Sequence, residues 1–258
     1  MKAITYPLTL IFAVSHAGAA TIAQYNFNSG STPYADVANA SGLSAGDIVL
    51  GDQMDSAPNI TTNYSSEGAG SLFVAGSAAN AGSGSTSTAW GNANTNGLYF
   101  EFTLTPDAGQ TLNLTNLELD VAAKGTDAFR LGVTSSLTGF DYADRLTITT
   151  ESSSDADSIP NVLQSNLDGI KLLTDTGVDE DWGAGEGTII DLSSSTFDNI
   201  SAPVTFRIYG FQLNNNTSTN AIFFDDIQVN GTVIPEASSF ALLAGFCTMG
   251  LVMVRRRR

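Results

Sequence analysis

The chain has 258 residues, and its 26 acidic side chains outnumber its 10 basic ones, so the net charge at pH 7 is −16. Binding to nucleic acid relies on clustered Lys and Arg, so this charge excludes nucleic acid as a partner. The chain has a single histidine, His16, and a single cysteine, Cys247. The segment between these two positions therefore has neither residue type. This excludes a disulfide scaffold, Cys–His and Ser–His–Asp catalysis, and Cys or His sites for zinc, haem or iron–sulfur clusters within it.

The first 20 residues have the pattern of a secretory signal peptide. Lys2 supplies a positive charge, residues 7–14 form a short apolar core, and residues 17–19, Ala-Gly-Ala, match a small-x-small cleavage site. The apolar core is too short to span a bilayer stably. We therefore expect signal peptidase to cut after residue 19 or 20, so that the rest of the chain is exported.

Residues 21–232 are predicted to form one all-β domain, a two-sheet antiparallel β-sandwich. Gly, Ser, Thr and Asn interrupt this segment throughout, and it contains no long amphipathic helical pattern. The clearest half-buried strand covers residues 97–105, where large apolar residues alternate with Tyr99, Glu101 and Thr103. The other predicted strands cover residues 21–27, 71–75, 111–121, 128–134, 145–150, 188–192, 204–213 and 221–229.

Two stretches between these strands are interpreted differently. Residues 75–96 are nearly all Gly, Ala, Ser, Thr and Asn around Trp90, so we expect a long surface loop or a mobile flap. Residues 158–167 are expected to contain a short helix.

Glu118 and Asp120 lie two positions apart on the predicted strand at 111–121, so they share one face of it. This glutamate-x-aspartate pair resembles the core of concanavalin-like glucanases. The resemblance implies another glutamate a few residues on, but residues 121–124 contain none, so the second carboxylate of a retaining hydrolase is missing. A solvent-facing polar row is the simpler interpretation, and we expect no catalytic residues.

An acidic cluster with Trp182 occupies residues 175–186. It lacks the spacing of an EF-hand loop, so we interpret it as a solvated acidic loop. An exposed indole beside carboxylates can stack on a sugar ring, which makes Trp182, and also Trp90, candidate ligand-binding residues. Burial in the core is the alternative for both tryptophans.

Residues 221–231 contain two adjacent aspartates within an apolar strand. Strict alternation puts Asp225 and Asp226 on opposite faces, and each face also carries large apolar side chains. A buried carboxylate is costly unless it is paired or bound to a metal. We therefore predict a structural calcium ion held by Asp225, Asp226 and Asn26. The alternative is that the aspartates accept hydrogen bonds from neighbouring backbone amides or from Arg207.

The same segment, Ala-Ile-Phe-Phe-Asp-Asp-Ile-Gln-Val-Asn-Gly, is similar to the closing strand of jelly-roll carbohydrate-binding modules and related concanavalin-like sandwiches. The resemblance implies a jelly-roll topology in which the first and last strands, residues 21–27 and 221–229, lie side by side. It implies no particular ligand.

The end of the chain has the pattern of a membrane-spanning tail. Residues 237–254 form an apolar run that extends about 27 Å as a helix, close to the thickness of a bilayer core. Clustered arginines stay on the cytoplasmic side, so we expect the helix to cross the membrane with its C-terminus inside. The residues that end the chain are Arg255, Arg256, Arg257 and Arg258.

Together, the Pro235-Glu236 dipeptide, the apolar helix and the basic end resemble the PEP-CTERM sorting signal of exported bacterial proteins, over residues 233–258. The usual third residue of that motif is proline, whereas this chain has Ala237. The resemblance implies cleavage near Pro235 and Glu236 by an exosortase-type membrane protease. An ordinary tail anchor is the alternative.

These features predict an exported, exosortase-processed protein that is anchored transiently in the inner membrane and then reaches the cell surface or the extracellular matrix. We expect it to be non-catalytic, and either structural or polysaccharide-binding. Without its terminal segments the chain keeps five basic and 25 acidic residues, a net charge of about −20 that is compatible with calcium and neutral sugars such as those of an exopolysaccharide. The alternative is a secreted polysaccharide-degrading enzyme of concanavalin-like fold.

Overall fold

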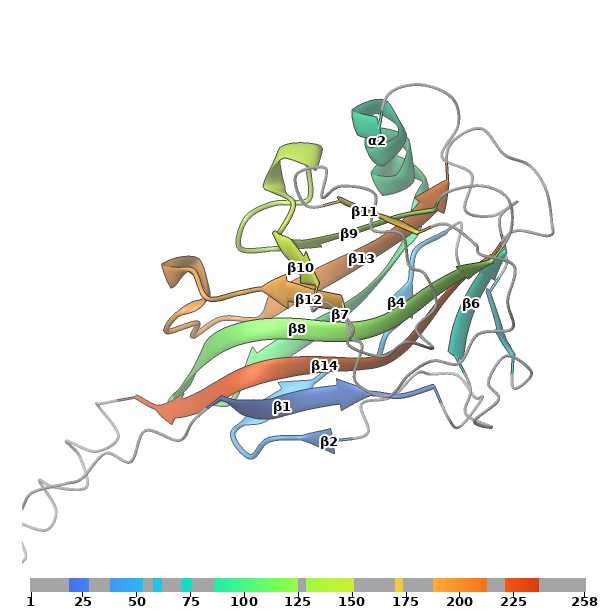
Figure 1. Cartoon of the computed structure of the whole chain (residues 1–258). Coiled ribbons are helices and arrows are strands. Elements are labelled where there is room, and N and C mark those ends of the chain that lie inside the picture. The colour runs from blue at the N-terminus through green and yellow to red at the C-terminus, as the bar shows by residue number, and fades with distance from the viewer. Residues whose placement is uncertain are drawn as a thin grey trace, which may run out of the picture.

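The computed structural model of the chain describes residues 19–27, 38–52, 58–61, 71–75, 86–124, 129–150, 170–173, 188–212 and 221–236. Within these residues strands predominate, and they form two antiparallel sheets that stack as a sandwich (Figure 1). The predicted all-β, two-sheet antiparallel β-sandwich is therefore confirmed.

The predicted terminal segments fall almost wholly outside this part of the chain. Residues 1–18 of the predicted signal peptide, the predicted helix at 237–254 and the basic end at 255–258 all lie outside the described residues. The short helix expected at 158–167 does so as well. Among the residues that are described, no helix combines the length and the apolar character needed to cross a bilayer.

The larger sheet is built around the last strand of the chain. Its strands, as far as the described residues show, are β1 (Ala20–Tyr25), β2 (Ala38–Asn39), β5 (Pro58–Thr61), β6 (Ser71–Ala75), β8 (Gln110–Lys124), β10 (Ile148–Thr150), β12 (Thr188–Asp191) and β14 (Ala221–Pro235). Their order is β10-β12-β8-β14-β1-β2, and β6 pairs with both β14 and β5. β1 and β14 are antiparallel neighbours, as predicted for the first and last strands.

The smaller sheet faces the larger one. Its strands within the described residues are β3 (Leu43–Ala45), β4 (Val49–Leu50), β7 (Tyr99–Pro106), β9 (Phe129–Ser135), β11 (Ile170–Leu173) and β13 (Val204–Gln212). Their order is β11-β9-β13-β7-β3, and β4 also pairs with β7. Two short 3-10 helices, η1 (Tyr142–Asp144) and η2 (Ser195–Phe197), lie in the connections.

Aromatic side chains join the two sheets. Phe100 on β7 contacts Phe224 on β14, with ring centroids 5.0 Å apart, and Phe102 of β7 contacts Tyr25 on β1 at 4.9 Å. All four rings are buried. Full burial of one such side chain contributes about 1.5–3 kcal/mol, so this contact accounts for much of the cohesion of a sandwich that contains no disulfide.

A helix, α2 (Thr86–Asn96), covers the outer side of the smaller sheet (Figure 1). The loop expected at residues 75–96 is therefore wrong over 86–96. The helix is rich in Thr and Asn and contains Gly91, all poor helix formers, and it lacks an acidic first turn and a basic last turn. It is stabilised by packing instead, since Trp90 inserts its ring against the sheet.

Between α2 and the smaller sheet lies a second apolar cluster, separate from the core between the sheets, and Trp90 is at its centre. Its buried members are Ala89, Trp90, Ala93, Leu98, Tyr209 and Phe211. Trp90 is 1% exposed, its ring lies 4.2 Å from that of Tyr209, and its Nε1 donates a hydrogen bond to the carbonyl oxygen of Phe140 at 3.3 Å. Its six-membered ring lies directly above Gly132 of β9, where a Cβ atom would collide with it. The absence of a side chain at Gly132 thus makes the space that Trp90 fills.

We predict that Gly132→Ala destabilises the protein by about 1–3 kcal/mol, because the added methyl group must displace the ring of Trp90. Gly91→Ala is the matched control, since Gly91 is exposed on α2 and its Cβ would meet no atom within 4 Å. That control should stabilise the protein by about 0.5–1 kcal/mol through the helix propensity of alanine. Urea unfolding followed by circular dichroism measures both, and equal effects would contradict the assigned position of Trp90.

Candidate functional site

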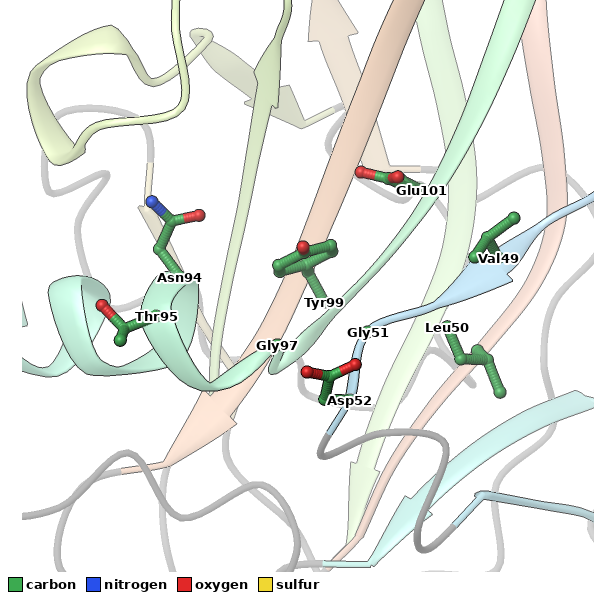
Figure 2. A pocket seen from close by; sticks show the side chains of 9 residues that line it. All are labelled: Val49, Leu50, Gly51, Asp52, Asn94, Thr95, Gly97, Tyr99 and Glu101. Atoms are coloured by element: carbon green, nitrogen blue, oxygen red, sulfur yellow. The ribbon is translucent and has the colours of Figure 1, made fainter.

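A pocket of about 240 Å³ lies where α2 ends against the edge of the smaller sheet. Three segments line it, as Figure 2 shows: β4 with the residues that follow it, the last turn of α2, and the first residues of β7. The lining residues are Val49, Leu50, Gly51, Asp52, Asn94, Thr95, Gly97, Tyr99 and Glu101.

Two glycines let these segments approach closely enough to form the pocket. Gly97 ends α2 with a positive φ of +72°, and the amide of Leu98 donates to the carbonyl of Ala93 at 2.8 Å, as in a Schellman C-cap. A Cβ on Gly97 would collide with the backbone nitrogen of Asp52, and one on Gly51 would collide with the carbonyl of Gly97. The backbone of residues 51–52 is therefore in direct contact with the end of the helix.

Arg207 of β13 holds the wall of the pocket in place. Its Nε donates to Glu101 Oε2 at 2.7 Å, and its guanidinium lies between two rings, 4.2 Å from the centroid of Tyr99 and 3.9 Å from that of Phe140. Burial alone would lower the pKa of Arg207, but the hydrogen bond to Glu101 and the interactions with Tyr99 and Tyr209 together outweigh it, and the pKa is raised. Arg207 therefore stays charged and neutralises Glu101.

Asn94 connects the helix to the same network. Its Oδ1 accepts hydrogen bonds from Arg207 Nη1 at 3.1 Å and from the hydroxyl of Tyr209 at 2.9 Å. Burial raises the pKa of Tyr209 to about 12, so its hydroxyl remains a donor at neutral pH. These bonds fix the side chain of Asn94 and hence the last turn of α2 over the sheet.

The pocket carries a net negative charge. Arg207 forms its salt bridge with Glu101, so Asp52, which is exposed, adds a second carboxylate that Arg207 does not neutralise. The C-terminal end of α2 contributes a further partial negative charge, and its last turn contains no basic residue. The arrangement can accept hydrogen bonds from a small polar ligand while repelling an anion.

Of the two tryptophans predicted to bind a ligand, the structure describes Trp90, and Trp90 does not line this site. Trp90 is buried beneath α2 and offers no free face to a sugar ring, so the alternative, burial in the core, applies to it. Trp182 and the acidic cluster at 175–186 lie outside the described residues. Tyr99 and Glu101 were recognised only as the polar face of a strand, and that alternation was the one signal in the sequence that pointed to the pocket.

The two aspartates of β14 lie at a β-bulge next to the end of β1. The register between β14 and β8 shifts between Asp225 and Gln228, and Asp226 has a positive φ of 42°. The bulge breaks the predicted alternation, because Phe224 and Ile227, three positions apart, are both buried in the core. Asp226 is consequently exposed and Asp225 is half-buried.

Asp225 is held by backbone amides. Its Oδ1 accepts from the amide of Asp226 at 2.9 Å and from the amide of Phe27 at 3.5 Å, as the alternative to calcium predicts, whereas Arg207 pairs with Glu101. Burial raises the pKa of Asp225 to about 6, with the charge of Asp226 adding to the effect. Burial also raises the pKa of Asp226.

The calcium site stays a prediction. No group of three or more His, Cys, Asp or Glu side chains suited to a metal occurs among the described residues. Asn26, the third predicted ligand, is half-buried next to Phe27, whose amide is bonded to Asp225. Backbone carbonyls and water are the other oxygen ligands that calcium accepts.

Glu118 lies in a polar row on the outer face of the larger sheet. Its Oε1 accepts from Asn116 Nδ2 at 3.0 Å and from Asn230 Nδ2 at 2.9 Å. Leu117 and Leu119 on the opposite face are fully buried, so the interpretation of β8 as an amphipathic strand is confirmed.

The residues of the predicted processing site continue the larger sheet. Pro235, the last residue of β14, lies opposite Gln110 of β8, and the amide of Glu236 donates to the carbonyl of Gly109 at 2.8 Å. β14 thus runs through the boundary predicted between residues 232 and 233.

No protein-family model matches the chain, and no curated protein matches it in sequence. Among solved structures the chain is similar to the K1 cleaved adhesin domain of Lys-gingipain from Porphyromonas gingivalis W83. The two share 12% sequence identity and a TM-score of 0.29, over 83% of this chain and 98% of that one. At this TM-score the likeness carries no argument about fold or function, and the interpretation depends on the residues of the chain itself.

The pKa of Asp225 predicts how stability depends on pH in calcium-free buffer. Because the folded-state pKa of about 6 exceeds the ordinary value of 3.8, the protonated carboxyl stabilises the fold below about pH 4, and this contribution is lost as the pH rises through 6. We expect Asp225→Asn to be more stable than the wild type by roughly 1–2 kcal/mol at pH 7, after allowing for partial solvent exposure, and equally stable at pH 4.

Denaturant unfolding at both pH values, with a chelator present, measures this difference. Asp198→Asn removes the same charge from an exposed loop and controls for the change in net charge. A wild type that is more stable than Asp225→Asn at pH 7 without calcium would contradict the assigned burial.

Proposed function

We propose that the chain is an exported, exosortase-processed protein of the bacterial cell surface or extracellular matrix, with a jelly-roll-like sandwich that is non-catalytic and either structural or polysaccharide-binding. The observation that supports this most is that the pocket lies at one end of the described sandwich, whereas β1 begins and β14 ends at the other. The pocket favours binding over a purely structural role.

The first strand of the described sandwich begins where the last strand ends. Ala20, which begins β1, pairs with Gly231 near the end of β14. The predicted signal peptide and the predicted tail helix would therefore join the domain at one end. A domain tethered to a membrane through that end would present its opposite end to the surroundings.

The pocket lies at that opposite end. β7 begins with Tyr99 in the pocket and finishes with Pro106, just before the turn whose Gly109 binds Glu236. Seven residue steps of about 3.3 Å put Tyr99 roughly 23 Å from the tethered end. Figure 1 shows α2 lying away from the point where β14 stops.

We also propose a structural calcium ion at Asp225, Asp226 and Asn26. The raised pKa of Asp225 and the positive φ of Asp226 support it, because a bound cation offsets the cost of a half-buried carboxylate at a strained bulge. Calcium should then raise the melting temperature of the wild type but not that of Asp225→Asn. An equal response of both proteins would reject the ion at this position.

Processing is predicted to leave β14 intact. Residues 233–235 are paired with β8, so a cut before Pro235 would remove part of the ladder, whereas a cut after Glu236 would not. We expect mass spectrometry of the exported protein to find its C-terminus at Glu236 or beyond. Replacing both Pro235 and Glu236 with alanine should block processing, while Thr232→Ala should not, and a mature C-terminus within residues 221–235 would contradict the prediction.

Polysaccharide binding is tested by co-sedimentation. We expect the full-length protein to sediment with an insoluble neutral polysaccharide such as cellulose or starch, or with exopolysaccharide from the producing cells, and to release no reducing sugar from it. Release of reducing sugar that Glu118→Gln abolishes would favour the alternative, a polysaccharide-degrading enzyme.

A further inference from the structure

We propose that the pocket between α2, β4 and β7 holds one uncharged pyranose ring of a polysaccharide. This inference rests on the proposed polysaccharide-binding function, and it assigns that function a subsite that Trp90 does not line. Val49 and Tyr99 contact the C–H face of the ring, and the carboxylates of Asp52 and Glu101 accept hydrogen bonds from its hydroxyl groups.

The size of the pocket suits one sugar ring. Its volume of 240 Å³ corresponds to about eight water molecules at roughly 30 Å³ each. Sites for drug-sized ligands start at about 300 Å³, so a run of several sugar units does not fit. Val49 at the rim is 58% exposed, which leaves the mouth open for the neighbouring units of a polymer to remain in solvent.

The lining matches the mixed surface of a pyranose. A sugar ring has apolar C–H faces and a rim of hydroxyl groups, and it binds where aromatic or aliphatic side chains lie beside hydrogen-bonding groups. Tyr99 supplies a ring whose other side is covered by the guanidinium of Arg207. Figure 2 shows Tyr99 between the carboxylates of Glu101 and Asp52, with Val49 and Leu50 on the neighbouring strand.

Charge selects an uncharged ring. The free carboxylate of Asp52 and the C-terminal end of α2 repel uronic acids and phosphorylated sugars. A cationic ligand near Glu101 would instead meet the guanidinium of Arg207, which is bonded to that carboxylate at 2.7 Å. The salt bridge thus leaves Asp52 as the carboxylate that sets the charge of the pocket, and this charge disfavours an anionic ring.

The pocket is shaped before any ligand enters. The contact between Gly51 and Gly97 fixes its floor, and the two hydrogen bonds to Asn94 fix the helix end above it. The amide of Gly51 also donates to the carbonyl of Tyr99 at 2.8 Å, which joins the segment after β4 to β7. A preformed pocket loses little conformational entropy on binding, which a ligand as small as one sugar ring requires.

The test is saturation-transfer-difference NMR on the full-length protein in a detergent without a sugar headgroup. The probes are D-glucose, D-galactose and D-mannose, with D-glucuronate and D-glucosamine as charged counterparts. We expect at least one neutral hexose to bind with a dissociation constant on the order of 1 mM, and glucuronate to bind at least about tenfold more weakly.

Two matched variants localise the binding. Val49→Arg places a long side chain at the mouth of the pocket, beside Glu101 on the adjacent strand, and should weaken hexose binding at least about tenfold. Leu137→Arg makes the same change at another exposed apolar residue, away from the pocket, and should leave binding unchanged. Asp52→Asn should restore binding of glucuronate toward that of the neutral hexose. Circular dichroism verifies that each variant folds.

The outcomes separate this inference from the proposed function. Loss of hexose binding in Val49→Arg but not in Leu137→Arg supports the subsite. If the protein sediments with a polysaccharide and both arginine variants do so equally, polysaccharide binding stands and the subsite is wrong. Binding of glucosamine alone would show a cation site and overturn the proposal, and an absence of binding to every hexose and every polymer would overturn both.

Discussion

The pairing of β14 with β8 is the interaction on which the rest of the structure depends. The two strands stay in contact from Ala221 opposite Lys124 to Pro235 opposite Gln110, and β1 and β6 pair with the other side of β14. Because β14 is paired on both sides over residues 221–224 and 228–231, its backbone groups there are satisfied within the sheet. The bulge at Asp225 and Asp226 is the exception that lets Phe224 and Ile227 both reach the core.

The pocket depends on a second apolar layer outside the sandwich. Tyr209 and Phe211 of β13 point away from the main core, and α2 covers them by inserting Trp90 above Gly132. This packing holds the end of the helix against the start of β7. The pocket thus exists because α2 packs on the smaller sheet through Trp90. Its lining residues come from three segments that are separate in the sequence.

Long alternating strands could be predicted from the sequence, and short or irregular features could not. β7, β8, β13 and β14 match the predicted strands closely, because alternation over many residues reports one buried face. β3 and β4 are too short to show a period, and α2 has the composition of a loop, so its helical state depends on the burial of Trp90. The β-bulge inserts one extra residue into β14, which breaks the alternation and is why the faces of Asp225 and Asp226 were assigned incorrectly over that short stretch.

The candidate site was predictable only in part, for a related reason. Tyr99 and Glu101 stood out as polar positions on a clear strand, whereas Asp52 and Asn94 join them only through backbone contacts between glycines and a hydrogen-bond network around Arg207. Both tryptophans were predicted to bind a ligand because an indole ring can stack on a sugar. The same large apolar ring also packs well in a protein core. Burial decided the matter for Trp90.

The adjacency of the first and last strands has a consequence for when the domain can fold. Thr21 of β1 bonds to Gln228 of β14, 207 positions later in the chain, so the larger sheet cannot close until nearly all of the sequence is present. Folding that depends on pairing between such distant segments is slow, and the incomplete chain lacks a closed larger sheet. A polypeptide with this topology stays unfolded enough to pass through a narrow translocation channel until its final strand has emerged. Only then can the larger sheet close.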